Sequence, residues 1–240
     1  MPGFSPLDLL IAAPGWLDEA LGRLRGAGFV VLLVPKGYTL SGLPEASETE
    51  LAAATQQFDP SSFLLRRRIG RAMAARYLGI APDSLGIASE KGGKPFLFGK
   101  PFLSGKYGLH IGFSARDGHS LIAMATGPIG VDFEGDIPQS GIAWNILRTE
   151  EAEVIRRAAA PDAAFLALWT RKEAIMKLIG SGFAIAPEQL FLDADGAFRI
   201  EPPAPGFSAT GHPALRETDW RDEQERRYRV VVAILPNVTR

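Results

Sequence analysis

The sequence predicts an α+β fold in which amphipathic helices and short apolar strands alternate along the chain. From Pro161 to Ile179 the apolar residues recur at intervals of three and four, as on the buried stripe of a helix. Residues 129–134 instead alternate between apolar and polar side chains, as in a strand with one buried face. The apolar runs Phe29–Val34 and Val230–Leu235 have the length of buried strands and are far too short to span a membrane.

Composition narrows the class of protein. Of the 240 residues, 46% are hydrophobic and 22% are charged, which is ordinary for a globular protein and argues against disorder. The net charge of −1 gives no global field to attract nucleic acid or an anionic membrane, so we expect neither as a partner. The absence of cysteine excludes disulfides and thiolate metal sites, and residues 1–13 lack the basic segment of a signal peptide. These features predict a cytoplasmic protein.

Local start and stop signals place the other elements, because capping residues precede helices and glycines follow them. The predicted helices are 14–28, 48–57, 63–78 with Pro60-Ser61-Ser62 as its cap, 142–147, 149–159 with Thr149 as its cap, and 161–179. The predicted strands are 29–34, 85–89, 121–125, 129–134, 190–192, 197–200 and 228–235, with a turn at 193–196 joining one pair.

The helix at 161–179 carries a polar cluster. Glu173 and Lys177 are four residues apart and therefore share one face of the helix, with Trp169 one turn earlier. Two charged side chains beside an aromatic ring are typical of a functional site. When the helix is considered alone, an i,i+4 ion pair on its surface is the simpler explanation.

A second polar cluster lies in the strand Ile129–Glu134. Asp132 and Glu134 project from one face, roughly 6–7 Å apart, and a cation between them would convert their repulsion into affinity. Together with Glu173 they would form a site of hard oxygen ligands that suits Mg²⁺, which takes few carboxylates and keeps several waters. Solvated acids at the end of a strand are the alternative explanation.

These two stretches together resemble the 4′-phosphopantetheinyl transferases, especially the larger single-chain type. That family carries an (Ile/Val)-Gly-(Ile/Val)-Asp-x-Glu strand, and later a Trp-x-x-Lys-Glu-(Ala/Ser)-x-x-Lys helix followed by Gly-x-Gly. This chain has Ile129-Gly130-Val131-Asp132-Phe133-Glu134, then Trp169 to Lys177, then Gly180-Ser181-Gly182. The order and separation of the motifs match, over roughly residues 60–200.

The resemblance implies two similar α/β halves related by a pseudo-twofold, with the active site in the cleft between them. We place the boundary at Gly127-Pro128, which gives halves at 1–127 and 128–240. The implied reaction is Mg²⁺-dependent transfer of 4′-phosphopantetheine from coenzyme A to a serine of an acyl or peptidyl carrier protein, by a monomer. The implied metal ligands are Asp132, Glu134 and Glu173, with Glu173 also as the base and Lys177 balancing the leaving phosphate.

The helix at 63–78 carries arginines at positions 66, 67, 68, 71 and 76. A guanidinium donates two parallel hydrogen bonds to phosphate, so this basic patch suits a phosphate ligand, although a solvated helix face explains it equally well. In the resembling family the corresponding helix lies near the nucleotide of coenzyme A. The resemblance therefore favours Arg66 and Arg67 as ligands, without deciding which of them makes the contact.

The sequence Gly-Lys-Pro-Phe-Leu occurs at 93–97 and again at 99–103. The resembling family has one Gly-Lys-Pro, close to coenzyme A. Lys94 with Pro95 is our first choice because a predicted strand precedes it. Lys100 is the alternative because its spacing to the next motif is more usual, and a hairpin with a polar tip would explain the repeat without a ligand.

The chain departs from the family at residues 109–116. Where the family has Asn-(Ile/Leu)-Ser-His-Ser, only Ser114 is retained, Ala115 replaces the phosphate-binding histidine and Arg116 replaces the second serine. Arg116 would restore the lost positive charge, so Ser114 and Arg116 are candidate ligands of coenzyme A. A degenerate member that binds coenzyme A or a carrier protein without transfer is the alternative function.

Three further residues have weaker claims. Family members often have a Thr/Ser-Glu pair at the start of the helix at 149–159, which makes Glu150 a secondary candidate, with helix capping as the alternative. For His110 and His119, a surface or packing role is favoured. Another magnesium-dependent phosphoryl enzyme is less favoured, because the sequence has no Walker-type or kinase-type glycine loop.

Overall fold

The structure is a computed structural model that describes residues 5–90, 93–99 and 109–235. The helices of these residues are α1 (Trp16–Ala27), α2 (Glu48–Ala54), α3 (Pro60–Leu78), α4 (Thr149–Arg157) and α5 (Pro161–Ile179). The strands are β1 (Ser5–Pro6), β2 (Leu10–Ile11), β3 (Phe29–Val34), β4 (Leu85–Ser89), β5 (Pro95–Gly99), β6 (His110–Arg116), β7 (His119–Ala125), β8 (Ile129–Gly135), β9 (Leu190–Leu192), β10 (Phe198–Ile200), β11 (Thr210–Gly211), β12 (Ala214–Arg221) and β13 (Arg227–Ile234). The fold is therefore mixed α+β, as the sequence predicts.

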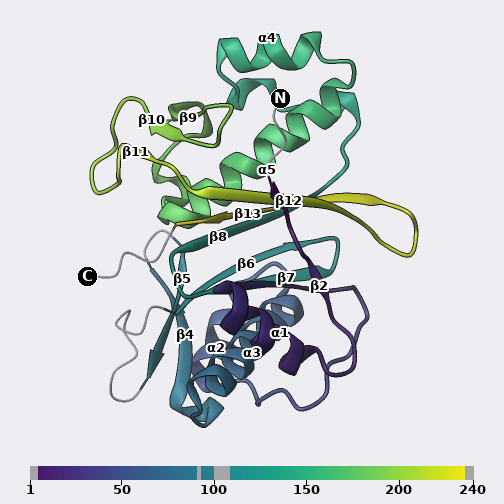
Figure 1. Ribbon diagram of the computed structural model, residues 1–240, viewed down its shortest axis with the longest axis vertical. Helices are drawn as coiled ribbons and strands as arrows, with labels where there is room; N and C mark the ends of the chain where they lie inside the picture. The colour runs from purple at the N-terminus through teal and green to yellow at the C-terminus, as the bar shows by residue number, and fades with distance from the viewer. Residues whose placement is uncertain (1–4, 91–92, 100–108, 236–240) are drawn as a thin grey trace.

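The elements form layers (Figure 1). Two four-stranded sheets, in the orders β1-β12-β13-β8 and β2-β3-β7-β6, pack face to face in the middle of the molecule. Helix α5 covers the outer face of the first sheet, while α1 and α3 cover the outer face of the second. The hairpin β4-β5 and the small sheet β11-β10-β9 lie beside these layers.

Both faces of the sheet β2-β3-β7-β6 are buried. Alternate residues of β3, such as Val30 and Leu32, pack with Leu24 of α1 and Met73 of α3. The intervening residues, such as Val31, pack against the other sheet. A strand that is buried on both sides needs apolar residues at every position, which is why 29–34 and 121–125 appear in the sequence as unbroken apolar runs.

Gly130 explains how closely α5 approaches β8. A Cβ atom at Gly130 would lie 2.1 Å from the carbonyl oxygen of Ala174 and 2.3 Å from the backbone nitrogen of Leu178. The helix backbone therefore lies directly on the strand at this residue. Gly130, Asp132 and Glu134 are alternate residues of β8 and therefore lie on the same face. The close contact at Gly130 thus brings the polar side of α5 to the two carboxylates.

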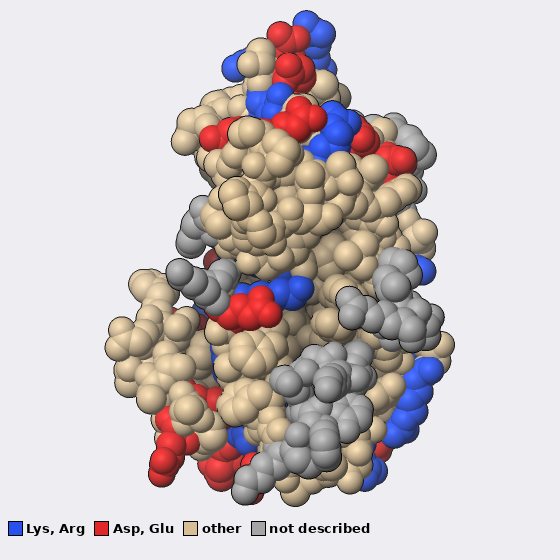
Figure 2. All heavy atoms as spheres, turned by 90° about the vertical axis from the view of Figure 1, so that its left-hand side faces the viewer, with Lys and Arg blue, Asp and Glu red and all other residues tan. Residues whose placement is uncertain are grey.

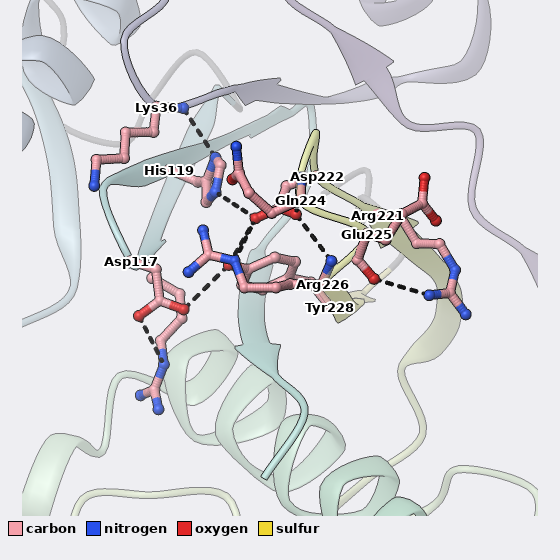
Figure 3. Close-up of polar contacts among 10 residues, drawn as sticks. Lys36, Asp117, His119, Arg221, Asp222, Gln224, Glu225, Arg226 and Tyr228 are labelled. Carbon is pink, nitrogen blue, oxygen red and sulfur yellow. Dashed lines mark hydrogen bonds and ion pairs between the residues drawn. The ribbon is translucent and has the colours of Figure 1, made fainter.

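Three turns meet at one end of the two sheets (Figure 3). The backbone N–H of Lys36, which follows β3, donates to Nδ1 of His119 at 2.9 Å, and Nε2 of His119 lies 3.6 Å from Oδ2 of Asp222 in the β12–β13 turn. The hydroxyl of Tyr228 donates to Asp117 of the β6–β7 turn at 3.1 Å. His119 and Tyr228 are almost fully buried, so this network joins the two sheets from inside.

Most predicted elements are confirmed, and the strand Phe29–Val34 and the helix Pro161–Ile179 have the predicted bounds. Gly28, Gly79 and Gly180 end their helices with positive φ, as expected for C-terminal glycines. The predicted strand at 228–235 is β13, and the pairing of 190–192 with 197–200 is confirmed.

Several local predictions are wrong. Residues 142–147 form no α-helix, because the segment contains only short 3₁₀ turns at Gln139–Gly141 and Trp144–Ile146. Asp59, and not Pro60-Ser61-Ser62, caps α3 by accepting the N–H of Ser62. Thr149 is the first helical residue of α4 and not its cap, because the Glu151 side chain accepts the N–H of Arg148, the residue before the helix. The long strand β12 was not predicted.

The two large sheets are not built from two consecutive halves of the chain. Ser5 and Pro6 of β1 pair in parallel with Arg216 and Glu217 of β12, so residues near the start of the chain complete the sheet that contains β8. The boundary at residues 127 and 128 and the pseudo-twofold stay predictions. In the described part of the chain, no helix has the length and apolar character needed to cross a membrane.

Candidate active site

A cavity of about 580 Å³ lies between α3 and α5. Its walls also include the turn between β4 and β5, parts of β6 and β8, and the segment after α5. Figure 2 shows a hollow between the upper and lower parts of the molecule, in which acidic and basic side chains lie together. The predicted site residues that line the cavity are Arg66, Arg67, Lys94, Pro95, Glu173 and Lys177.

The other predicted residues lie on β6 and β8, and Ser114 and Asp132 contact the cavity residue Lys177. The ammonium of Lys177 is 2.6 Å from Oδ1 of Asp132, and the hydroxyl of Ser114 donates to the same oxygen at 3.1 Å. Asp132 is only 2% exposed. Lys177 therefore connects α5 to β8. Its ion pair is with Asp132, whereas an i,i+4 surface pair would require Glu173 as the partner.

Burial and charge repulsion control the protonation of two carboxyl groups in the site. Burial, followed by the charge of Asp132 and then that of Glu134, raises the pKa of Glu173 to about 7, although Lys177 opposes the shift. Burial and the charge of Asp132 also raise the pKa of Glu134. The three carboxylates thus lie close enough to repel one another, as a shared cation site requires.

Arg116 neutralises part of this negative charge. Its Nη1 atom lies 3.1 Å from Oε2 of Glu134, although the arginine side chain is 45% exposed. Glu134 also accepts a hydrogen bond from the side chain of Trp169. Lys177 and Arg116 therefore each supply positive charge to a different acid of β8, and Arg116 reaches a carboxylate from the place of the family's second serine.

The chemistry of the carboxylates suits a divalent cation. Oδ2 of Asp132 is buried and has no hydrogen-bond partner among the described residues, and the raised pKa values of Glu134 and Glu173 reflect uncompensated negative charge. In the described ranges, however, no three such side chains are gathered closely enough to form a ready metal centre. A cation bound by all three carboxylates would compete with Lys177 for the charge of Asp132 and with Arg116 for that of Glu134.

The structure separates the roles of the helix arginines. Arg67 stacks on Phe63 and donates to the carbonyl of Ile87 and, at 2.9 Å, to the hydroxyl of Ser89. Arg66 lines the cavity, and its buried Nη1 has no hydrogen-bond partner within the described residues. Burial lowers the pKa of Arg66, which reflects the cost of a charge without a full set of partners. Arg67 also has a buried Nε without a partner, but both of its Nη atoms donate to this chain, so a terminal nitrogen without a partner is found on Arg66.

The remaining arginines of α3 are held by this chain. Arg71 forms a buried ion pair with Glu50 of α2, with 2.9 Å between Nε and Oε1. Arg68 donates to the carbonyl of Pro44 at 2.6 Å, and the exposed Arg76 lies 3.9 Å from Asp18 of α1. The arginine-rich helix therefore combines structural anchors, such as Arg71, with side chains that line the cavity.

Lys94 also contacts α5. Its ammonium donates to the carbonyl of Leu178, in the last turn of that helix, and its stem lies beside Gly180. A lysine at this place stabilises the negative end of the helix dipole. Pro95 lines the cavity as the first residue of β5, which forms a hairpin with β4. The second copy of the repeat lies largely outside the described residues, so a hairpin as the explanation of the repeat stays a prediction. Lys100 lies outside the described residues.

The weaker candidates have structural contacts. Glu150 is 76% exposed and lies 3.6 Å from Arg148, outside the cavity lining. His119 is part of the buried network of Figure 3, and burial lowers its pKa. Burial and the charge of Lys94 lower the pKa of the half-buried His110.

Sequence reasoning missed residues that shape the site. Gln57 and Ser89 line the cavity, but neither belongs to a motif. Lys172 is 1% exposed and donates to Glu151 of α4 at 2.8 Å and to the carbonyl of Pro187 at 2.9 Å, so it fixes α4 to α5. Its place in the Trp-x-x-Lys-Glu motif was the available signal for this structural role.

Comparison with protein families agrees with this geometry. Residues 128–233 match the model of the 4′-phosphopantetheinyl transferase superfamily, a region that runs from β8 through α5 to β13. A search among curated proteins finds no match. The family match confirms the resemblance that the two motifs predict, and residues 128–233 belong to the 4′-phosphopantetheinyl transferase superfamily.

Proposed function

We propose that the chain transfers 4′-phosphopantetheine from coenzyme A to a serine hydroxyl of an acyl or peptidyl carrier protein, as a monomer. The superfamily carries out this transfer in general. In the reaction a bond forms between the serine oxygen and the phosphorus that bears the pantetheine group. The bond from that phosphorus to the bridging oxygen of the pyrophosphate breaks, adenosine 3′,5′-bisphosphate leaves, and the serine proton passes to a base.

The position and pKa of Glu173 are the observation on which this proposal depends. Its carboxylate lines the cavity, and a pKa of about 7 suits a base that takes a proton near neutral pH. Such a base contributes about 10²–10⁴-fold to the rate. Lys177 lines the same cavity one helical turn later, where its ammonium can balance the charge of the leaving phosphate.

Coenzyme A would bind along the wall formed by α3. We assign a phosphate of its nucleotide end to Arg66, because Nη1 of this residue has no partner in the described structure. Arg67, whose donors reach Ile87 and Ser89, would keep the wall in place. Lys94 would act mainly through the end of α5, since its ammonium already donates to Leu178.

Asp132, Glu134 and Glu173 are the residues that would hold Mg²⁺. When bound, the ion would supply positive charge to the pyrophosphate oxygens. Lys177 and Arg116, which pair with Asp132 and Glu134, are the cationic groups of this chain that could also contact the phosphates of the donor. Ser114, which donates to Asp132, would keep that carboxylate oriented.

A second candidate is a protein that binds coenzyme A or a carrier protein without efficient transfer. It is favoured by the loss of the family's histidine at Ala115 and by the ion pairs that Lys177 and Arg116 form with the acids of β8. In such a protein these ion pairs would take the place of the metal.

Mass spectrometry separates the two candidates. An apo carrier protein is incubated with the chain, coenzyme A and Mg²⁺, and we expect its mass to rise by one phosphopantetheine group. Glu173→Gln should lower turnover by about 10²-fold or more without changing the circular dichroism spectrum. Glu153→Gln, at a half-exposed position of α4 paired with Arg157, is the matched control and should keep wild-type turnover.

Two outcomes would contradict the proposal. Wild-type turnover in Glu173→Gln would remove this residue from the mechanism. Calorimetry that detects binding of coenzyme A, together with no mass change on any of a panel of acyl and peptidyl carrier proteins, would favour the second candidate.

A further inference from the structure

Phe58 is the most exposed large apolar side chain among the described residues, with an exposed fraction of 107%, against 50% for Leu51 and 36% for Phe96. It lies between two fixed points of the backbone. The N–H of Gln57 donates to the carbonyl of Ala54 at the end of α2, and Asp59 caps α3. The ring is therefore held in solvent by an ordered turn between two helices.

The residues on either side place this ring at the rim of the cavity. Gln57 is exposed and yet lines the cavity, so it belongs to the rim. Asp59 acts electrostatically on Arg66, which lies on the α3 wall. Phe58 therefore lies near the part of the cavity that Arg66 lines, and Nη1 of this arginine is buried without a hydrogen-bond partner among the described residues.

An exposed aromatic ring near an arginine that can bind phosphate suits a ligand in which a planar base is joined to a phosphate group. The ring face gains free energy when a flat apolar surface covers it, and base–aromatic stacking is tolerant of the exact partner. Resting on the function proposed above, we propose that Phe58 stacks on the adenine base of coenzyme A while Arg66 binds a phosphate of the same nucleotide. Phe58 is thus a specificity residue for the donor.

Phe96 is the competing aromatic at the rim. It follows the cavity residue Pro95 and is also exposed, but its ring centroid lies 6.3 Å from that of Phe98, so the two rings already contact each other. Phe96 also lies on β5, two residues after Lys94, and not in the α2–α3 turn that precedes Arg66. These differences favour Phe58 for the base and make Phe96 the matched control.

The kinetic test compares Phe58→Ala, Phe58→Trp and Phe96→Ala in the transfer assay. Loss of a stacking ring weakens binding about five- to 100-fold. We therefore expect Phe58→Ala to raise KM for coenzyme A at least about fivefold with little change in kcat, because the base does not take part in bond breaking. Phe58→Trp and Phe96→Ala should stay within about twofold of wild type. A wild-type KM in Phe58→Ala, or the rise appearing only in Phe96→Ala, would overturn the assignment.

A fluorescence test does not depend on transfer. In Phe58→Trp the added indole should be quenched by coenzyme A and by adenosine 3′,5′-bisphosphate, but not by pantetheine, after subtraction of the signal from the wild-type chain with its four tryptophans. Quenching without transfer by the wild-type chain would retain the stacking and reject the proposed function. Transfer by the wild-type chain without quenching in Phe58→Trp would retain the proposed function and reject the stacking.

Discussion

Replacing Gly130 by alanine tests whether the contact between β8 and α5 sets the geometry of the site. The new Cβ would lie 2.1 Å from the carbonyl oxygen of Ala174, 2.3 Å from the nitrogen of Leu178 and 2.7 Å from its Cα. All three are backbone atoms of α5, so no side-chain rotation can relieve the overlap. To bring the shortest contact to 3.0 Å, the helix and strand must separate by roughly 1 Å.

This displacement should affect both stability and catalysis. Overpacking of a closely packed interior destabilises by about 1–3 kcal/mol, a substantial part of the total stability of a domain. Glu173 and Lys177 lie next in sequence to Ala174 and Leu178, so they must move with them. A shift of about 1 Å in a catalytic group lowers the rate by about 10²-fold.

Gly112→Ala is the matched control for stability, because it also adds one methyl group to a strand glycine at the cavity. Its Cβ would meet the Val131 side chain at 3.4 Å, an ordinary contact. Urea denaturation should show a clear loss for Gly130→Ala and a much smaller change for Gly112→Ala. Equal stability of the two variants, or wild-type turnover in Gly130→Ala, would refute the argument that the glycine sets the approach of the helix.

Four further predictions concern charge and pH. Mg²⁺ binding and proton transfer both need ionised Glu173, whose pKa is about 7 without the metal, so kcat/KM at subsaturating Mg²⁺ should rise about tenfold from pH 6 to pH 8, and a flat profile would contradict its role. The raised pKa of Glu173 means that its contribution to stability is complete below the ordinary pKa of 4.5 and is lost as the pH rises through about 7. Because Mg²⁺ binds the ionised carboxylate, added Mg²⁺ should raise the melting temperature, measured by calorimetry, more at pH 8 than at pH 5.5. Arg116→Gln frees Glu134 and should tighten Mg²⁺ binding severalfold, measured by titration calorimetry; weaker binding would mean that the arginine helps to form the site. The pKa of His119 is lowered, so its contribution to stability is present above pH 6.5 and is lost as the pH falls below that value. In urea denaturation, the difference in stability between wild type and His119→Gln should therefore shrink from pH 7.5 to pH 5.

The sequence allowed the main elements of the fold and the central cluster of the site to be predicted. Local signals suffice for α3 and α5, because glycines at 79 and 180 end them and apolar residues repeat at helical spacing. The alternation in Ile129–Glu134 correctly predicted which side chains of β8 face the core between the sheets. The proximity of Asp132 and Glu173 followed from the resemblance and not from periodicity.

The remaining features depend on contacts between distant segments, which local patterns do not encode. Whether Lys94 faces a ligand or the carbonyl of Leu178 depends on how the β4–β5 hairpin packs against α5. The segment 142–147 has apolar residues at helical spacing, but it packs as irregular chain against α4 and α5 through Ile142. The polar alternation of β12 is weak in sequence, and its pairing with β13 makes it a strand.

The parallel pairing of β1 with β12 has a consequence for how the protein is made. Ser5 and Pro6 leave the ribosome first among the described residues, but their partners Arg216 and Glu217 are synthesised about two hundred residues later. Until then β1 has no strand to pair with, and Leu7 lacks the core that will bury it. A fragment that begins at residue 128 lacks β1, so the edge of β12 at Arg216 and Glu217 stays unpaired and should mediate self-association unless a peptide bearing residues 1–12 is supplied.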